Sequence, residues 1–462
     1  MNNQNPIRMS RWAHFFERHG VTALFNSVSL GLMFLPEETS RSLESLLRKP
    51  KRMGEIKEAV GADVVEALVN ENILVTDGFD DLKYFEGVRQ KLSEEVTLEL
   101  MYLLVTDHCN LRCGYCFEDA PIQIKPFHPI HMSVEIAREA IDLYARMVTR
   151  YSDPKKKKVI HLYGGEPLMN RDVVRFAVDY ICELKARKRL PATCETAIVT
   201  NGIFLDDETA RFLSEKGVTV GVSIDGPRAI NNLYRKAKDG KLDVFTAVMK
   251  ALDLLRKYKA KVGLSVTLTP EAVQNFDQLL AFLIDEVGWV DGVSLNILHF
   301  NPSVALSPNY YSDAVGCQIT AFKRFRALGM YEDRMMRKAK AFINRQPIYA
   351  DCGVVGNQLV IAPDGQIGVC QDFVKPRTYF RGSVMDRDID PVTAGLFEGW
   401  RKRSPFFMED CFDCPAMGIC GGGCPASAEL KTGSRWSLDE RACAHGKMVL
   451  EWLIWETYAQ LA

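Results

Sequence analysis

Three cysteines near residue 110 have the spacing of a metal-cluster site. Cys109, Cys113 and Cys116 are separated by three and then two residues, and they follow the apolar run 101–105. The irons of a 4Fe-4S cluster normally take four thiolates, so a cluster held by these three would keep one iron open to a small molecule. For this spacing alone, a zinc site or three unrelated core thiols are the simpler alternatives.

Seven further cysteines follow from residue 352 onward, in a segment with little room for a hydrophobic core. They are Cys352, Cys370, Cys411, Cys414, Cys420, Cys424 and Cys443, and glycines and prolines lie between them. Metal must therefore supply much of the folding energy of this segment. The spacings alone fit zinc and iron-sulfur equally.

Glycine and polar motifs end two apolar runs in the middle of the chain. Tyr163 is followed by Gly164, Gly165 and Glu166, where two glycines let the backbone approach a ligand and a carboxylate can accept hydrogen bonds from an ammonium group. Ser223 and Asp225 end a later run, and Arg235 follows them. Helix or turn capping is the alternative role for Ser223 and Asp225.

Strand and helix patterns alternate between residues 97 and 300, which is typical of a parallel α/β barrel. The expected strands are 98–105, 159–163, 196–200, 218–224, 261–268 and 292–298, and the expected helices are 134–151, 171–185, 207–216, 245–258 and 272–287. Six strands instead of eight predict an open, partial barrel. Chemistry in such barrels lies at the carboxyl ends of the strands, where each of the motifs above is found.

The flanking segments predict separate units, so that the domains are 1–95, 96–305, 306–350 and 351–462. Residues 1–95 contain no cysteine, and a hairpin around Gly31, helical patterns and a short strand indicate a small winged-helix-like α+β unit. The basic run 48–52 is interpreted as a solvated loop between helices more readily than as a DNA contact. Residues 306–350 predict connector helices after a tyrosine-rich loop at 309–311, with Cys317 buried and unreactive.

Composition restricts the partners and the compartment. The 462 residues include 58 basic and 59 acidic side chains, a formal net charge of -1, so no global field favours nucleic acid or an anionic membrane. The 13 cysteines are an odd number in clustered spacings, which indicates metal binding in a reducing compartment. No uninterrupted apolar run approaches the length of a membrane span, so we expect a cytoplasmic protein.

Taken together, these motifs resemble those of the radical S-adenosylmethionine (SAM) superfamily. The resemblance rests on C-x3-C-x2-C with Tyr115 before its third cysteine, on Gly-Gly-Glu, and on the pattern C-x12-G-x4-C, C-x2-C-x5-C-x3-C, C of the auxiliary-cluster domain called SPASM. It covers about residues 97–450, and it favours iron-sulfur clusters over zinc as the metal that the cysteines bind. The fold that it implies is a partial (β/α)6 barrel between the winged-helix-like unit and a C-terminal SPASM iron-sulfur domain.

The resemblance also implies a role for each site residue. Cys109, Cys113 and Cys116 would hold the SAM-binding 4Fe-4S cluster. The residues around S-adenosylmethionine would be Tyr115, Tyr163, Gly164, Gly165, Glu166 toward its amino group, Ser223 and Asp225 toward its ribose, and Arg235 toward its carboxylate. Cys411, Cys414, Cys420 and Cys443 would hold one auxiliary cluster.

Cys352, Cys370 and Cys424 would hold the other auxiliary cluster, with its fourth ligand unassigned. Some relatives have an extra cysteine just before the position of Cys352, but residues 346–351 contain none here. This departure leaves either an open iron, which could bind a substrate thiolate, or a non-cysteine ligand.

The chemistry implied is reductive cleavage of S-adenosylmethionine to a 5'-deoxyadenosyl radical, which abstracts a hydrogen from the substrate. Auxiliary clusters suit the removal of an electron from the substrate radical, which favours an oxidative modification. The expected substrate is a ribosomally synthesised precursor peptide that receives a thioether or carbon-carbon crosslink, with its leader held by the N-terminal unit. An electron donor such as flavodoxin or ferredoxin is expected, whereas the sequence indicates no oligomeric state.

Two alternatives remain. An anaerobic sulfatase-maturing enzyme would make formylglycine, but in those enzymes an aspartate directly follows the cysteine that Cys370 matches, and here Gln371 stands before Asp372. Asp372 is the only candidate for a catalytic base, with a structural turn acid as its alternative role. A non-catalytic iron-sulfur regulator that binds DNA would leave Gly164, Gly165, Glu166 and Arg235 without a purpose.

Overall fold

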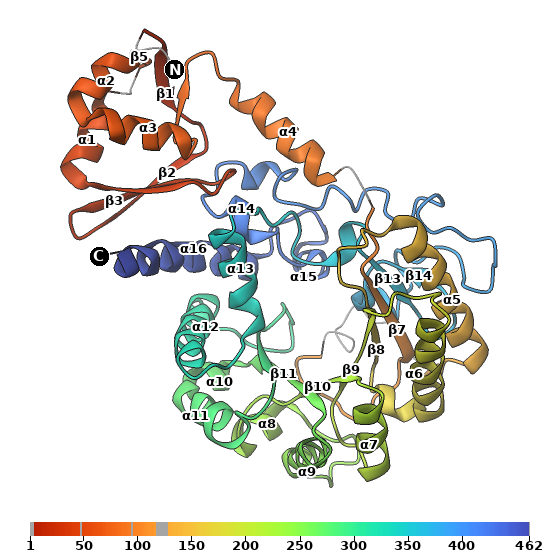
Figure 1. The fold of residues 1–462 in the computed structure, drawn as a ribbon. Coiled ribbons are helices and arrows are strands. Elements are labelled where there is room, and N and C mark those ends of the chain that lie inside the picture. Colours follow the sequence, from red (N-terminus) through yellow and green to blue (C-terminus); the bar gives the residue numbers. More distant parts are fainter. Residues whose placement is uncertain (1–3, 47–48, 94–95, 117–127, 462) are drawn as a thin grey trace.

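The computed structural model describes residues 4–46, 49–93, 96–116 and 128–461 (Figure 1). Its centre is an eight-stranded sheet with the strand order β12-β11-β10-β9-β8-β7-β13-β14. Figure 1 shows these strands around the inside of an open ring, with helices on the outside. The expected domain boundary at residue 95, and Arg48 of the basic run, lie outside the described residues.

Six parallel strands form the predicted partial barrel, which is confirmed. They are β7 (Leu100–Thr106), β8 (Val159–Gly164), β9 (Glu195–Thr200), β10 (Thr219–Ser223), β11 (Lys261–Leu268) and β12 (Gly292–Ile297), and each pairs in parallel with its neighbour. In β11 every second residue is buried, as expected for a strand with helices on one face.

Helices follow the strands and cover the outside of the barrel. They include α5 (Val134–Tyr151), α6 (Arg171–Ala186), α7 (Asp207–Glu215), α8 (Arg228–Tyr234) and α9 (Val244–Lys257). Ser133, Asp206 and Asp243 are the N-caps of α5, α7 and α9, and each accepts a hydrogen bond from a backbone N–H of the first turn. Four of these five helices were predicted, whereas α8 was not.

The single helix predicted over 272–287 is wrong. The structure has α10 (Pro270–Gln274), α11 (Phe276–Ala281) and one π-helical turn, η3 (Phe282–Glu286). Asn275 separates the first two with φ -110° and ψ 37°, and its side-chain amide donates to the carbonyl of Glu271 at 2.9 Å. An asparagine that bonds to its own backbone neighbours competes with the helix in this way.

Two short strands from the C-terminal region extend the barrel sheet beyond the six predicted. β13 (Gln358–Ile361) pairs in parallel with β7, and β14 (Ile367–Gly368) pairs antiparallel with β13. All four residues of β13 are buried. The segment that carries Cys352 and Cys370 is therefore built onto the edge of the barrel.

The N-terminal region has the α+β composition that was expected. Its elements are β1 (Pro6–Met9), β2 (Ala13–Arg18), β3 (Val21–Asn26), β4 (Leu32–Pro36), α1 (Glu37–Leu46), β5 (Lys51–Arg52), α2 (Met53–Val60), α3 (Ala62–Asn70) and β6 (Leu74–Thr76). The strand orders are β5-β1-β6 and β2-β3-β4, and the second contains the predicted hairpin. The basic run is not wholly a loop, because Lys51 and Arg52 pair with β1.

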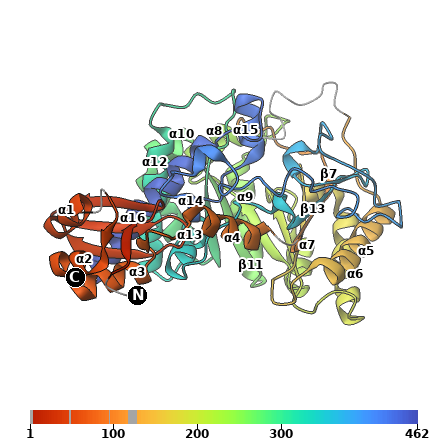
Figure 2. The same cartoon turned by 90° about the horizontal axis from the view of Figure 1, so that it is seen from above.

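The C-terminal helix packs against this N-terminal region. α4 (Asp81–Ser93) leads away from it, while α16 (Glu440–Leu461) returns to it from the far end of the chain (Figures 1 and 2). The rings of Phe34 on β4 and Tyr458 on α16 are 5.1 Å apart, and Arg18 Nη2 is 3.2 Å from Glu451 Oε1. The two ends of the chain are thus joined by apolar and charged contacts.

The remaining helical elements lie after β8, between the barrel and the cysteine-rich region, and within that region. They are α12 (Tyr310–Ala327), α13 (Asp333–Ile343), α14 (Met417–Cys420) and α15 (Pro425–Thr432), with 3-10 turns η2 (Pro167–Asn170), η4 (Gly353–Val355), η5 (Gln371–Phe373) and η6 (Glu409–Cys411). Tyr310, expected in a loop, opens α12, and its hydroxyl donates to the carbonyl of Leu268. Among the described residues, no helix is both long and apolar enough to cross a bilayer.

Candidate active site

The three-cysteine loop leaves the carboxyl end of β7 and lies against the segment after α8. Leu111 forms an isolated bridge with Ala237, and the Gly114 N–H donates to the carbonyl of Tyr234 at 3.0 Å. Cys109, Cys113 and Cys116 are all half-buried. These backbone bonds fix the loop that carries the three thiols.

Gly164 and Gly165 allow the end of β8 to touch this loop. A Cβ at Gly164, where φ is 144°, would lie 2.0 Å from the carbonyl oxygen of Thr106, and one at Gly165 would lie 2.5 Å from that of His108. The N–H groups of Gly165 and Glu166 donate to these same two oxygens. Both glycines are thus required for a close approach within the protein, and their predicted contact with S-adenosylmethionine stays a prediction.

Glu166 is 1 % exposed, and its carboxylate joins the ends of β8 and β9. It accepts hydrogen bonds from the Thr200 hydroxyl at 2.7 Å, the Asn201 N–H at 2.7 Å and the Leu168 N–H at 3.0 Å. Burial raises the pKa of Glu166, and these bonds partly offset the increase. Its predicted role toward an ammonium group is therefore additional to a structural one.

Asn201 is a site residue that the sequence reasoning missed. Its side-chain amide donates to Asn110 Oδ1 at 2.8 Å and lies 3.8 Å from Cys109 Sγ. The available signal was its position directly after the third strand of the barrel. Because hydrogen bonds to cluster sulfurs tune the reduction potential, Asn201 is suited to that task.

Asp225 and Arg235 form a buried ion pair after β10. Arg235 Nε is 2.9 Å from Asp225 Oδ2, and the Tyr115 hydroxyl donates to the same carboxylate oxygen. The Thr267 N–H donates to Asp225 Oδ1 at 3.0 Å. Ser223 ends β10 half-buried beside them. The structure thus brings together the residues predicted near the ribose and the carboxylate, although these roles remain predictions.

Tyr163 is half-buried at the carboxyl end of β8. Its ring lies 5.6 Å from that of Tyr102 in an edge-on arrangement. Burial raises the pKa of Tyr102 to about 12, and Cys352 and Cys370 contribute to the increase. Tyr102 therefore lies between the predicted S-adenosylmethionine site and the auxiliary thiols.

One group of four thiols fits a metal cluster. Burial, followed by the charges of the other three thiols, Cys420, Cys443 and Cys414, raises the pKa of Cys411 to about 12. The pKa of Cys443 is raised to about 12 by burial and then by Cys420 and Cys414. Thiols that oppose one another's ionisation in this way become thiolates together only when a cation lies between them, so the donor set fits the implied cluster.

The second group contains three thiols and a carboxylate. Burial raises the pKa of Cys370 well above its ordinary value, followed by the charges of Asp372, Cys424 and Cys352. Burial also raises the pKa of Asp372 to about 6. The Cys424 thiol lies 3.9 Å from Asp372 Oδ2. This set also fits a cluster, with the predicted base at its side.

The remaining thiols lie apart from both groups. Cys194 is buried, and burial raises its pKa to about 11. Burial likewise raises the pKa of Cys317 on α12 to about 11. Cys182 lies on α6 and is half-buried. The raised pKa values of Cys194 and Cys317 are those of unreactive thiols, but Cys317 is half-buried instead of buried as predicted.

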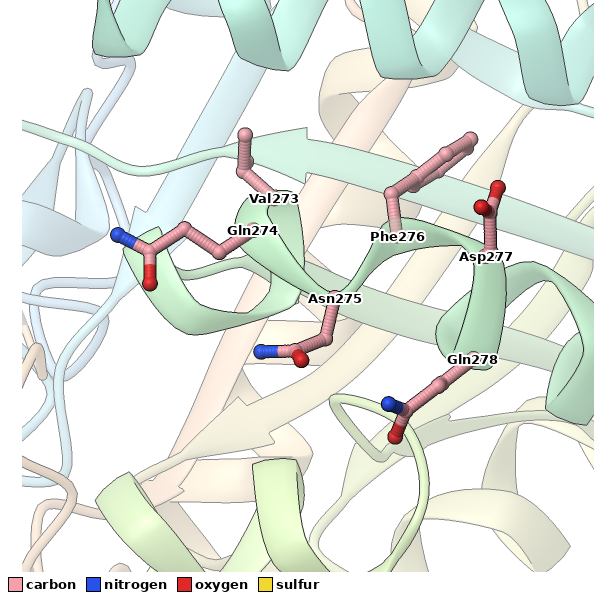
Figure 3. Close-up of a pocket in the computed structure, with 6 residues that line it drawn as sticks. All are labelled: Val273, Gln274, Asn275, Phe276, Asp277 and Gln278. Carbon is pink, nitrogen blue, oxygen red and sulfur yellow. The ribbon is translucent and has the colours of Figure 1, made fainter.

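Two surface cavities differ in their relation to this site. One of 360 Å³ lies at the break between α10 and α11, and Figure 3 shows that its six lining side chains spread along the chain without converging. It contains none of the predicted ligands. The other, of 640 Å³, is lined by Cys352 together with Lys91, Lys156, Arg337 and Arg401. The second cavity therefore opens beside the auxiliary thiols.

An α/β barrel with a three-thiol loop at its strand ends, and two thiol groups beside it, defines an iron-sulfur enzyme. Residues 103–283 match the model of the Radical SAM superfamily, so this part of the chain is a radical SAM domain. The protein is a radical SAM enzyme, whose cofactors are a 4Fe-4S cluster and S-adenosylmethionine. The C-terminal cysteines fit auxiliary clusters.

Two curated relatives are similar to the chain over different lengths. The radical SAM cyclopropyl synthase TigE of Paramaledivibacter caminithermalis is 22% identical over 98% of this chain and 97% of its own. The cysteine-type anaerobic sulfatase-maturating enzyme of Clostridium perfringens is 24% identical over 74% of this chain and 92% of its own.

Solved structures share the fold. Native anSMEcpe with bound AdoMet has a TM-score of 0.65 at 19% identity, covering 79% of this chain and 100% of that one. Streptococcus suis SuiB bound to its precursor peptide SuiA has a TM-score of 0.54 at 15% identity, covering 95% of this chain and 99% of that one. At these identities the likeness shows the fold alone.

Proposed function

We propose that this radical SAM enzyme oxidatively modifies a ribosomally synthesised peptide by forming a thioether or carbon-carbon crosslink. The observation that carries the proposal is the N-terminal α+β region joined to α16. The similarities to TigE and to SuiB, which was solved with a precursor peptide, extend over nearly the whole chain, whereas the similarity to anSMEcpe leaves about a fifth of it uncovered. That fraction matches the length of the N-terminal region.

A peptide leader would bind the N-terminal region by strand addition. Among the described residues, β2 pairs only with β3, so the outer edge of β2 presents unpaired backbone groups. A peptide that adds a strand gains main-chain hydrogen bonds there, and side-chain pockets give specificity. Phe15 on β2 is 36% exposed and offers an apolar contact.

When bound, S-adenosylmethionine and its cluster supply the radical that abstracts a hydrogen atom, and the auxiliary clusters supply an acceptor for one electron of the substrate radical. The residues Gly164, Gly165 and Glu166, together with Asp225 and Arg235, would orient the nucleotide at the strand ends. Asp372 would accept the proton released when the crosslink closes. Overall the peptide loses two hydrogen atoms.

An electron carrier such as flavodoxin or ferredoxin would exchange electrons with the enzyme. The cavity beside Cys352 supports this proposal, because Lys91, Lys156, Arg337 and Arg401 line it against the acidic Glu99 and Asp351. An excess of positive side chains suits an acidic partner.

The test is anaerobic incubation of the reconstituted enzyme with dithionite, S-adenosylmethionine and a short peptide encoded beside its gene. A peptide that loses two hydrogen atoms, together with 5'-deoxyadenosine, supports the proposal. Conversion of a cysteine or serine to formylglycine in a sulfatase peptide would establish the alternative activity instead. As controls, Cys109→Ala should abolish formation of 5'-deoxyadenosine, while Cys424→Ala should retain it and lose the modified peptide.

A further inference from the structure

The second auxiliary thiol group has one ligand too few. Cys352, Cys370 and Cys424 provide three thiolates, whereas the irons of a 4Fe-4S cluster take four protein ligands when none is left open. Residues 346–351 contain no cysteine. The three thiols outside both groups lie elsewhere, on α6, before β9 and on α12.

His299 lies beside the incomplete group. Ligand atoms of His299, Asp372 and Cys424 are all within 4.8 Å of one another. His299 follows β12, the last strand of the six-stranded barrel. In the eight-stranded sheet, β12 lies at one end and β13 and β14 lie at the other, so His299 and the segment of Cys370 come from opposite ends of the sheet. The sequence reasoning did not single it out, because no other candidate ligand stands near it in the chain.

The loop that carries His299 is fastened to the Cys424 segment on both sides. The N–H of Phe300 lies 3.3 Å from the hydroxyl oxygen of Ser427, on the first turn of α15. Arg441 Nη1 donates to the carbonyl of Ile297 at 3.2 Å, and Arg441 Nη2 binds Asp439 Oδ2 at 2.9 Å.

The same carboxylate of Asp439 also binds the thiol-bearing residue. Asp439 Oδ2 accepts from the Cys424 N–H at 2.9 Å. The chain from Ile297 through Arg441 and Asp439 to Cys424 is therefore continuous. The imidazole of His299 is held against the thiol of Cys424 by backbone anchors instead of by its own contacts alone.

We propose that His299 supplies the fourth ligand of the iron-sulfur cluster held by Cys352, Cys370 and Cys424. The proposal rests on the proposed function only in assuming that this auxiliary cluster is present. Imidazole is an established replacement for thiolate at iron-sulfur centres.

Imidazole suits this position better than the carboxylate of Asp372. A neutral imidazole adds no charge to a half-buried site that already contains three thiolates, whereas a carboxylate adds a fourth negative charge that the thiolates repel. Asp372 then stays available as a base.

Ligation by His299 has a consequence for the electron transfer. Iron-sulfur centres in which histidine replaces cysteine have higher reduction potentials than all-thiolate ones. This cluster would therefore accept an electron from a substrate radical more readily than a four-cysteine cluster. The replacement of the missing cysteine by His299 would then raise the reduction potential of the cluster, and no iron would be left without a protein ligand.

The test is pulsed electron paramagnetic resonance on the reduced full-length enzyme, produced with 15N-histidine and with Cys109, Cys113 and Cys116 replaced by alanine to remove the third cluster signal. We expect a 15N coupling to one auxiliary cluster that disappears in His299→Ala. His299→Cys should keep the iron content, lose the nitrogen coupling and lower the reduction potential. His161→Ala, which removes another histidine of the barrel, is the matched control and should keep the coupling.

Two results would overturn the assignment. One is the absence of 15N coupling in the variant that lacks the triad but retains His299. This result counts only if the enzyme with an intact triad contains about twelve iron atoms per chain, as three four-iron clusters require. The other is a coupling that survives His299→Ala. Either result leaves the proposed peptide modification intact, because that proposal fails only if the peptide is unchanged in an enzyme that cleaves S-adenosylmethionine.

Discussion

Arg235 and Asp225 form an ion pair inside the barrel, with Arg235 Nε 2.9 Å from Asp225 Oδ2 and Asp225 0 % exposed. Asp225, which is expected near the ribose of S-adenosylmethionine, is therefore paired with Arg235, which is expected near its carboxylate. The guanidinium of Arg235 has further N–H groups, because a single arginine carries five donors. It can keep Asp225 and still bind a carboxylate.

Arg235→Met should destabilise the enzyme by about 3–5 kcal/mol, because it leaves the buried charge of Asp225 without its partner. It should also weaken S-adenosylmethionine binding at least about tenfold, the equivalent of one lost charged hydrogen bond. Urea unfolding and calorimetric titration under anaerobic conditions measure the two effects.

The matched control for Arg235 is Arg228→Met, at the other end of α8. Arg228 pairs with Asp243 at the surface, where an ion pair contributes up to about 1 kcal/mol. Equal losses of stability in the two variants would contradict the role assigned to the buried pair.

Asn201→Ala should lower the reduction potential of the site cluster and leave its iron content unchanged. The variant removes the amide that lies 3.8 Å from Cys109 Sγ, and a lost hydrogen bond to a cluster sulfur destabilises the reduced, more negative form. A redox titration followed by electron paramagnetic resonance measures the shift. Asn232→Ala, on α8, removes an amide that donates to Asp243 and should leave the potential as it is. An unchanged potential in Asn201→Ala would exclude this role.

Stability should depend on pH through Glu332, the buried N-cap of α13. Burial raises its pKa from 4.5 to about 7, and hydrogen bonds from the N–H groups of Met335, Leu295 and Arg334 only partly offset the increase. The folded state thus retains a proton that the unfolded state has released. The resulting stability is fully present below pH 4.5 and is lost as pH rises through about 7, a decrease of roughly 3 kcal/mol in the free energy of unfolding.

Glu332→Gln should remove that part of the pH dependence, since an amide does not titrate. Chemical unfolding at several pH values, compared with the wild type, isolates the difference. Asp333→Asn, which changes the adjacent and more exposed carboxylate, should keep most of the wild-type pH dependence, because burial and not the charge of Asp333 is the main cause of the raised pKa of Glu332. Identical slopes in wild type and Glu332→Gln would show that Glu332 has an ordinary pKa.

The sequence predicted the features that depend on local pattern. The alternation of apolar residues along β11 is a local pattern of the chain, so the barrel strands and most helices were recognised from the sequence. The assignment of the cysteines to separate clusters came from the family resemblance and not from their spacings. The roles assigned to single residues around S-adenosylmethionine rest on resemblance.

Features that depend on distant contacts could not be predicted. β13 has only four residues and is a strand because β7 lies beside it. Asn201 and His299 reach thiols that are far from them in the chain, and nothing in their own neighbourhood reveals this. The break at Asn275 arises because its side chain competes for backbone hydrogen bonds of the helix, and a periodic pattern of apolar residues does not reveal this.

Reversal of charge at the cavity beside Cys352 should slow electron exchange with an acidic carrier. In the double variant Lys91→Glu and Lys156→Glu, we expect about a tenfold lower rate of carrier-dependent turnover at low salt, because steering by opposite charges raises association rates by roughly this factor or more. The difference should shrink at high ionic strength, where charges at the surface are screened. Lys250→Glu with Lys257→Glu, on α9, introduces the same charge away from the cavity and should leave the rate and its salt dependence unchanged. Equal rates for both double variants with reduced flavodoxin would show that the carrier binds elsewhere on the enzyme.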